Sequence, residues 1–226
     1  MPGKDRDLFS KGRGILSDLQ RLLLDRLQKD LPDFYLTGGS ALGEFYLGHR
    51  VSQDLDLFTT RLNAFDSADV VVRNVALEFA LEVSVLRSGT GFRRYLLTRG
   101  EEQLVLDVVH ETVEQLDQEK PVIEGLRVDT VREITANKLC AVVGRSELKD
   151  LIDLYFIEKT GVNLLDLLND AQRKDGGLTP ATLAYTLSQI STSGRLQGLL
   201  IPVSKEDLTR FRDRLVDALT RMAFPK

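Results

Sequence analysis

The chain has 226 residues, a formal net charge of −4 at pH 7 and a pI of about 5.4. Hydrophobic residues make up 42% and charged residues 28%, which is typical of a folded globular protein with one large core, or a core and a smaller helical lobe. The acidic balance excludes a strongly basic nucleic-acid binder at the level of the whole chain, although a local basic patch stays open.

The sequence shows no sign of a membrane or a secreted protein. No apolar run approaches the roughly 20 residues of a membrane-spanning helix, and the first fourteen residues are polar, without the apolar segment of a signal peptide. We therefore expect a cytoplasmic protein with no membrane partner. The single cysteine, Cys140, excludes an internal disulfide and a cysteine-rich zinc site.

Taken in chain order, the first element is an amphipathic helix. Leucines recur at helical spacing over residues 14–31, and Pro32 ends the helix. Phe34 to Thr37 is typical of a short strand, which Gly38-Gly39 breaks. A short helix is expected over residues 40–48.

The rest of this half alternates between strands and one further helix. In Asp54-Leu55-Asp56-Leu57-Phe58 the two acids fall on one side of a strand and the leucines on the other. The pattern then predicts a helix over residues 66–80 that begins near Asp66 or Ser67. Two strands, Glu82 to Arg87 and Phe92 to Thr98, are expected to form a hairpin, and a last strand is expected from Leu104 to Val109.

From about Asp129 the pattern becomes helical. Thr130 and Glu133 have the spacing of a capping box, and two helices are expected up to Gly144 and from about Ser146 to Lys159. Further helix starts are indicated at Thr179-Pro180 and at Ser204 with Asp207. We therefore expect an α/β chain, α+β in detail: a small mixed sheet with helices over residues 1–128, and a helical C-terminal lobe over residues 129–226.

Chemistry is indicated first by Gly38, Gly39 and Ser40. Two glycines after a strand let the backbone approach a ligand closely, the amides of a following helix can bind phosphate, and the serine hydroxyl adds a further donor. A Gly-Gly pair that is only a turn is the alternative. The acids that follow a short distance along the chain favour a functional interpretation of these three residues.

Asp54 and Asp56 are the candidate metal ligands. They point the same way from a strand, and Mg²⁺ favours one or two carboxylates together with substrate phosphates. Asp107 lies in a later strand of aliphatic residues, where an acid is costly unless it is paired or binds a metal. The alternatives are the solvated side of a strand for the pair and a salt-bridged edge residue for Asp107.

Together these segments resemble the DNA polymerase β-like nucleotidyltransferase superfamily, in which Gly-Gly-Ser, a short helix and Asp-x-Asp are followed by a third carboxylate on a later strand. The resemblance implies the minimal nucleotidyltransferase fold. It also implies two Mg²⁺ or Mn²⁺ ions on Asp54, Asp56 and Asp107, and an NTP as the substrate. We also expect one of the carboxylates, Asp107, to help deprotonate the attacking hydroxyl.

A closer resemblance is to the AbiEii/AbiGii toxin family, which includes the MenT-type toxins. It is carried by the segments ITANKLCA and RSELKDLIDLYF, and it extends from about Phe34 to Phe156. In that family a lysine approaches the NTP phosphates and a Lys/Arg-Asp-x-x-Asp-Leu segment completes the pocket. The matching positions are Lys138, Asp150 and Asp153, and a basic residue often stands where Arg50 stands here.

The residues leave alternatives open at these positions. Lys138 could be a surface lysine, and acids three apart on a helix, such as Asp150 and Asp153, often bind an amide or an arginine instead of substrate. Arg87, Arg93, Arg94 and Arg99 surround the expected hairpin turn, where they could hold an RNA backbone or could be merely solvated.

The resemblance implies transfer of an NMP to RNA, with the 3′ end of a tRNA as the expected acceptor, by the toxin of a toxin–antitoxin pair that has a cognate antitoxin. A protein or small-molecule acceptor is the first alternative, as in AMPylation or antibiotic modification. A non-catalytic module that binds an NTP or a partner is the second. An interaction protein with incidental motifs is the third.

Overall fold

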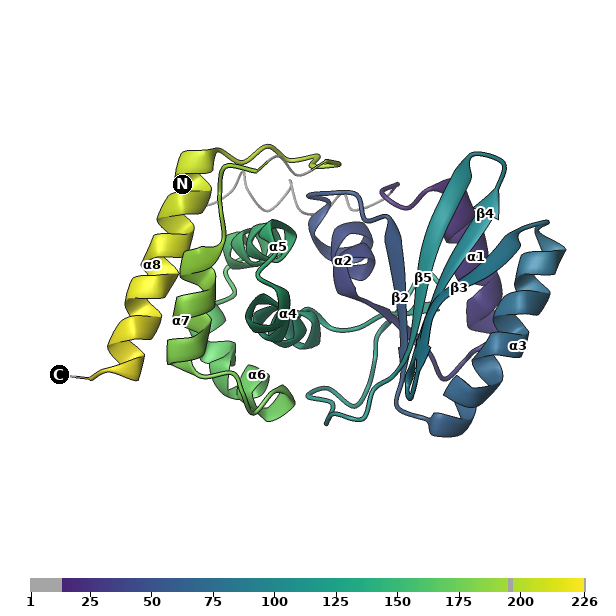
Figure 1. The fold of residues 1–226 in the computed structure, drawn as a ribbon, viewed down its shortest axis with the longest axis horizontal. Coiled ribbons are helices and arrows are strands. Elements are labelled where there is room, and N and C mark those ends of the chain that lie inside the picture. Colours follow the sequence, from purple (N-terminus) through teal and green to yellow (C-terminus); the bar gives the residue numbers. More distant parts are fainter. Residues whose placement is uncertain (1–13, 195–196, 226) are drawn as a thin grey trace.

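Strands β1 to β5 form a mixed sheet in the computed structural model, which describes residues 14–194 and 197–225 (Figure 1). The sheet order is β1-β2-β5-β4-β3, in which β2 and β5 are parallel and the other neighbours antiparallel. This confirms the expected mixed sheet. The strand bounds are Tyr35–Thr37 (β1), Asp54–Thr59 (β2), Glu82–Gly89 (β3), Phe92–Arg99 (β4) and Glu102–His110 (β5).

Helices α1 (Asp18–Asp30) and α3 (Leu62–Glu78) cover one face of the sheet (Figure 1). Ser17 begins α1 with a capping box, as the sequence pattern allows. The expected start of α3 near residue 66 is wrong. The helix begins four residues earlier without a side-chain cap, because burial of Phe65 at 3% exposure fixes its first turn, and the Ser67 hydroxyl bonds the Ala64 carbonyl inside the helix.

A single helical segment follows β1. It begins as α2 (Gly38–Ala41) and widens at once into a π-helix, η1 (Leu42–Leu47), over the residues where a short helix was expected. Gly48 ends it in the left-handed conformation, with a φ of 64°, as a terminal glycine predicts. Short π-helices are frequent at functional sites.

The second half of the described chain is helical, as expected. Thr130, Thr179 with Pro180, and Ser204 cap three of its helices. Two helices and a small hairpin were not predicted: η2 (Leu164–Leu167), α6 (Leu168–Lys174) and β6–β7 (Val122–Ile123, Leu126–Arg127). The remaining bounds are Val131–Arg145 (α4), Leu148–Lys159 (α5), Pro180–Gln189 (α7) and Lys205–Ala223 (α8).

The helical half lies on the other side of the sheet from α1 and α3, with the segment of α2 and η1 between them (Figure 1). Helix α4 contacts α2, and α5 contacts η1, so the two halves meet around the glycines after β1. Domain bounds of 1–128 and 129–226 stay a prediction. None of the helices in the described part of the chain is both long and apolar enough to cross a membrane. The polar N-terminal segment, up to residue 13, lies outside the described residues.

Candidate active site

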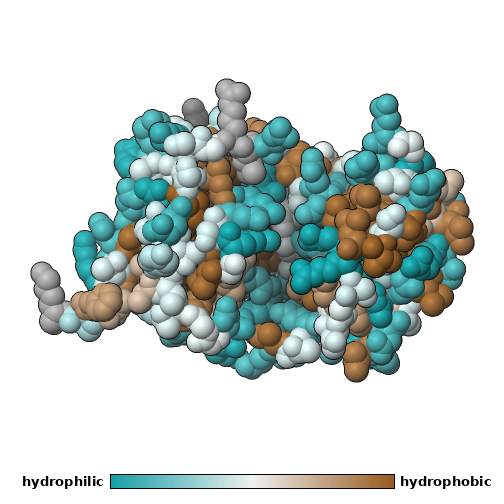
Figure 2. All heavy atoms as spheres, in the orientation of Figure 1, coloured by the Kyte–Doolittle hydropathy of each residue, from teal (hydrophilic) through white to brown (hydrophobic). Residues whose placement is uncertain are grey.

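A cavity of about 540 Å³ lies between the sheet and the helical half. Residues of β1, β2, β4 and β5 form one wall, and α4 with the start of α5 forms the other. Figure 2 shows it as a recess with hydrophilic side chains around it, between the two halves of the molecule. The recess therefore joins parts of the chain that the sequence pattern placed in separate halves.

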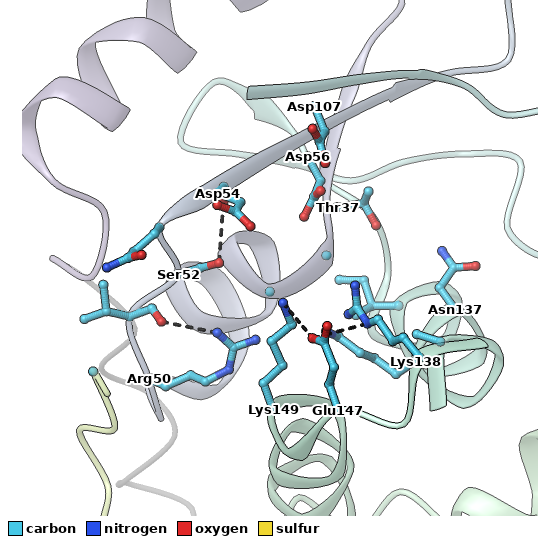
Figure 3. A pocket seen from close by; sticks show the side chains of 18 of the residues that line it. Thr37, Arg50, Ser52, Asp54, Asp56, Asp107, Asn137, Lys138, Glu147 and Lys149 are labelled. Carbon is cyan, nitrogen blue, oxygen red and sulfur yellow. Dashed lines mark hydrogen bonds and ion pairs between the residues drawn. The ribbon is translucent and has the colours of Figure 1, made fainter. Parts of the chain in front are cut away.

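The acids of the sheet wall stand in one row across neighbouring strands. Thr37 of β1 pairs with Asp56 of β2, which pairs with Asp107 of β5, which pairs with Arg94 of β4. Residues directly opposite each other project from the same face of a sheet. Asp54 lies two residues before Asp56 and shares that face, and all three carboxylates line the cavity (Figure 3).

These carboxylates differ in what they bind. Neither Asp54 nor Asp56 receives a side-chain hydrogen bond or ion pair within the described residues. Burial, and then repulsion from Asp107, raise the pKa of Asp56 to about 6. Both oxygens of Asp107 accept bonds from Arg94, at 2.8 and 2.6 Å. Asp107 therefore has a cation of its own, and the other two do not.

The two glycines after β1 are required by close approach. A Cβ on Gly38 would lie 2.1 Å from Oδ2 of Asp56, and its φ of 70° is one that residues with side chains rarely adopt. A Cβ on Gly39 would lie 2.5 Å from a guanidinium nitrogen of Arg50. The glycines thus leave room for the carboxylate of Asp56 and the guanidinium of Arg50, which both line the cavity. Ser40, in contrast, is fully buried and does not line it.

One face of α4 supplies most of the opposite wall, through Asn137, Lys138 and Arg145 at helical spacing. Lys138 is 6% exposed, and its Nζ contacts Asp153 at 2.7 Å and Asp150 at 3.0 Å. Arg145 makes two bonds to Asp150, each of 2.7 Å. Two cations of the cavity are therefore held from behind by carboxylates of α5.

Asp153 binds Arg50 as well as Lys138. Arg50 donates to its two oxygens from Nε at 2.7 Å and Nη2 at 2.8 Å, and His49 contacts it through Nε2 at 2.7 Å. The neighbouring Lys138 and Arg50 hold the pKa of the Asp153 carboxyl well below its usual range, despite complete burial. Burial lowers the pKa of His49, so the imidazole is the neutral partner of this cluster.

Asp150 and Asp153, expected to bind the NTP by resemblance, therefore lie behind the cavity and not on its surface. Both are fully buried, and neither lines the cavity. The structure instead brings Arg50 and Lys138 to the cavity and uses the two acids to position them. This matches the alternative that the residues themselves left open, in which such acids bind arginine.

The start of α5 adds a pair that solvent can reach. Lys149 and Glu147 line the cavity opposite Asp54 and contact each other at 2.9 Å (Figure 3). Their side chains are 35% and 44% exposed, so the lysine can exchange this partner for an anionic ligand at little cost.

Sequence reasoning missed several lining residues. Asn137, Arg145, Lys149 and Glu147 lie in or near the segments that carried the family resemblance, yet no spacing rule selects them. Arg94 was seen only as one of four hairpin arginines. Its position opposite Asp107 could be found only from the strand register.

A divalent cation fits the sheet wall. Within the described residues the oxygens of Asp54 and Asp56 are unpaired on one face, and a cation beside them would offset the burial and the carboxylate repulsion that raise the pKa of Asp56. No group of three or more histidine, cysteine or acidic side chains converges closely enough to hold a metal alone within residues 14–194 and 197–225. Two carboxylates completed by substrate phosphates are the usual arrangement for Mg²⁺.

Comparison with known proteins confirms the resemblance found in the sequence. The chain belongs to the AbiEii family, nucleotidyltransferase toxins of type IV toxin–antitoxin systems, whose family model matches residues 21–225. It is therefore an enzyme of the nucleotidyltransferase class. No curated protein matches it.

Solved structures share the fold. A putative nucleotidyltransferase from H. pylori has a TM-score of 0.57 at 22% identity, over 92% of this chain and 99% of its own. JHP933 from Helicobacter pylori has a TM-score of 0.57 at 21% identity, over 91% and 92%. MenT4, a nucleotidyltransferase toxin from Mycobacterium tuberculosis H37Rv, has a TM-score of 0.54 at 17% identity, over 89% and 82%.

Proposed function

We propose that this member of the AbiEii family transfers a nucleoside monophosphate from an NTP to a hydroxyl group of an RNA, in a reaction that requires Mg²⁺ or Mn²⁺. One observation carries the proposal. Asp54 and Asp56, which have no side-chain partner among the described residues, face Lys138, Arg145 and Lys149 across a cavity of about 540 Å³. A triphosphate with its metal matches this division of charge.

The triphosphate would lie between the two walls. Lys138, Arg145 and Lys149 would neutralise its oxygens from the helical side, and Arg50 would do so beside Gly39. The helix that begins at Gly38 has no side-chain cap, because the Thr37 hydroxyl donates to Asp129 instead. Its first amides would donate to a phosphate oxygen.

The reaction would be an in-line displacement at the α-phosphorus. The acceptor oxygen forms the new bond to phosphorus, the bond to the bridging oxygen of pyrophosphate breaks, and pyrophosphate leaves with that electron pair. Asp107, at the β5 end of the carboxylate row, would take the proton of the attacking hydroxyl. A metal held by Asp54 and Asp56 with Asp107 beside them would stabilise the charge on the phosphate oxygens.

For the acceptor we propose the 3′ end of a tRNA, reached in the cytoplasm, and for the biological role growth inhibition that a cognate antitoxin protein relieves. The family implies the toxin–antitoxin pair. The RNA acceptor is supported by two arginines on the strands next to Asp107, which are Arg94 of β4 and Arg87 of β3. A protein acceptor, a small-molecule acceptor and a non-catalytic NTP-binding module are the competing outcomes of the test.

The test is transfer of label from each of four α-labelled NTPs to total RNA with Mg²⁺. Asp56→Asn should abolish transfer, while Asp66→Asn, which removes an exposed carboxylate of α3 outside the cavity, should not. Label on protein or on a small molecule would refute the RNA acceptor. Absence of label with NTP binding intact would refute catalysis, and transfer that survives EDTA would refute the metal requirement.

A further inference from the structure

The row of site residues continues beyond the cavity across two more strands. Arg94 of β4 lies opposite Asp107, and Arg87 of β3 lies opposite Arg94. Adjacent strands are about 4.8 Å apart, so two arginines extend the row of carboxylates by about 10 Å toward the edge of the sheet. Arg87 does not line the NTP cavity.

A bulge brings Arg87 onto this face. The register of β3 and β4 shifts between Val85 and Arg87, so Leu86 is the extra residue of the bulged strand. In a regular ladder Leu86 would lie opposite Arg94 and Arg87 would project from the α3 side. Bulges next to active sites often redirect a side chain in this way. Here the redirected side chain is a second guanidinium on the catalytic face.

This arrangement costs stability within the protein itself. Like charges directly opposite each other on neighbouring strands repel. Arg94 is compensated by Asp107, but no acidic side chain of the described residues forms an ion pair with the exposed Arg87. The charge of Arg87 is therefore available to an anionic ligand.

An aromatic ring lies close to both arginines. Phe92 is half-buried on the same side of β4, with the guanidinium carbons of Arg87 and Arg94 at 5.7 and 5.9 Å from its centre. The other two hairpin arginines are used elsewhere. Arg93 packs on Phe65 of α3, and Arg99 pairs with Glu102 at the far end of β4.

We propose that Arg87, Arg94 and Phe92, here termed the acceptor surface, bind the single-stranded 3′ end of the acceptor RNA. The terminal hydroxyl would reach Asp107, the preceding phosphates would meet Arg94 and then Arg87, and a base would stack on Phe92. Phosphate-binding arginines beside a stacking ring are what single-stranded nucleic acid requires. This inference rests on the proposed function for its acceptor.

The test measures RNA and NTP separately. Binding of a fluorescein-labelled single-stranded oligoribonucleotide with a free 3′ hydroxyl is followed by anisotropy, and transfer kinetics are measured with total tRNA. Arg87→Ala should weaken oligoribonucleotide binding and raise the KM for tRNA about tenfold. It should lower the salt slope of binding by about 0.7, and the KM for the NTP should stay within twofold.

Two further variants decide the interpretation. Phe92→Leu keeps the packing of the strand and should weaken binding about fivefold or more through lost stacking. Arg99→Ala removes the same charge from the other end of β4 and should change binding less than twofold. Equal effects of Arg87→Ala and Arg99→Ala, or none from the former, would overturn the acceptor surface.

The proposed function can fail separately. If the wild type labels no RNA but binds the oligoribonucleotide through Arg87, the surface stands and the acceptor chemistry is wrong. Label on a protein, with oligoribonucleotide binding unchanged in Arg87→Ala, would overturn both.

Discussion

Asp153→Asn should be among the most destabilising single changes around the site, although it alters no residue that lines the cavity. The carboxylate is fully buried and contacts His49, Arg50 and Lys138 at 2.7–2.8 Å. Asparagine keeps the shape but removes the charge and one acceptor. Arg50 would then have no ion-pair partner within the described residues, and Lys138 would keep only Asp150.

Loss of one partner from a buried ion pair costs about 3–5 kcal/mol. For a chain of this size that corresponds to a decrease in Tm of roughly 6–20 °C. Thermal and urea unfolding of the apoprotein measure it directly. The matched control is Asp213→Asn, because Asp213 pairs with Arg212 at the surface with its side chain 57% exposed, and about 1 kcal/mol or less is expected there.

The pH dependence gives a second readout. The folded protein holds the pKa of Asp153 well below its usual range, whereas in the unfolded chain it returns to about 3.9. The ionised carboxylate therefore stabilises the fold fully above pH 4, and this contribution is lost as the pH falls further. The stability difference between wild type and Asp153→Asn should narrow below about pH 4. A Tm within 2 °C of wild type at pH 7 would refute the buried cluster as a source of stability.

Three further outcomes are expected. Gly38→Ala should fold but lose transfer and Mn²⁺ binding, because its Cβ would collide with Asp56. Gly100→Ala is the control, with a φ of 60° and open space around it, and it should keep both activities. Equal losses in the two variants would point to backbone strain instead of the collision. Mg²⁺ affinity, measured by calorimetry, should fall about tenfold for each pH unit below about 6, because burial and Asp107 raise the pKa of Asp56 to about 6 and the protonated acid does not bind the metal. An affinity that does not change with pH would contradict this. Lys149→Ala should raise the Kd for the NTP about tenfold with an unchanged Tm, and Lys159→Ala at the far end of α5 should not.

Local patterns in the sequence were sufficient for most of the elements. Alternation of acids and leucines around Asp54 and Asp56 predicted both the strand and the face that its acids share, because side chains alternate strictly along a strand. Caps at Thr130, Thr179 and Ser204 are local as well, since each side chain bonds an amide three residues away. The start of α3 could not be found in this way, because packing of Phe65 fixes it.

The sequence also determined the family, the nucleotidyltransferase class and the shared face of Asp54 and Asp56, since these depend on short motifs and on alternation along one strand, whereas the place of Asp107 beside them depends on the pairing of β2 with β5. Only the tertiary structure determined which partner each charged side chain contacts. Asp150 and Asp153 hold Lys138 and Arg50 from behind the cavity, and a one-residue bulge moves Arg87 onto the face of the sheet that carries the three carboxylates. A charge acts through the partner it meets, and for these side chains that partner lies on another element or depends on the register between strands, which no local spacing records.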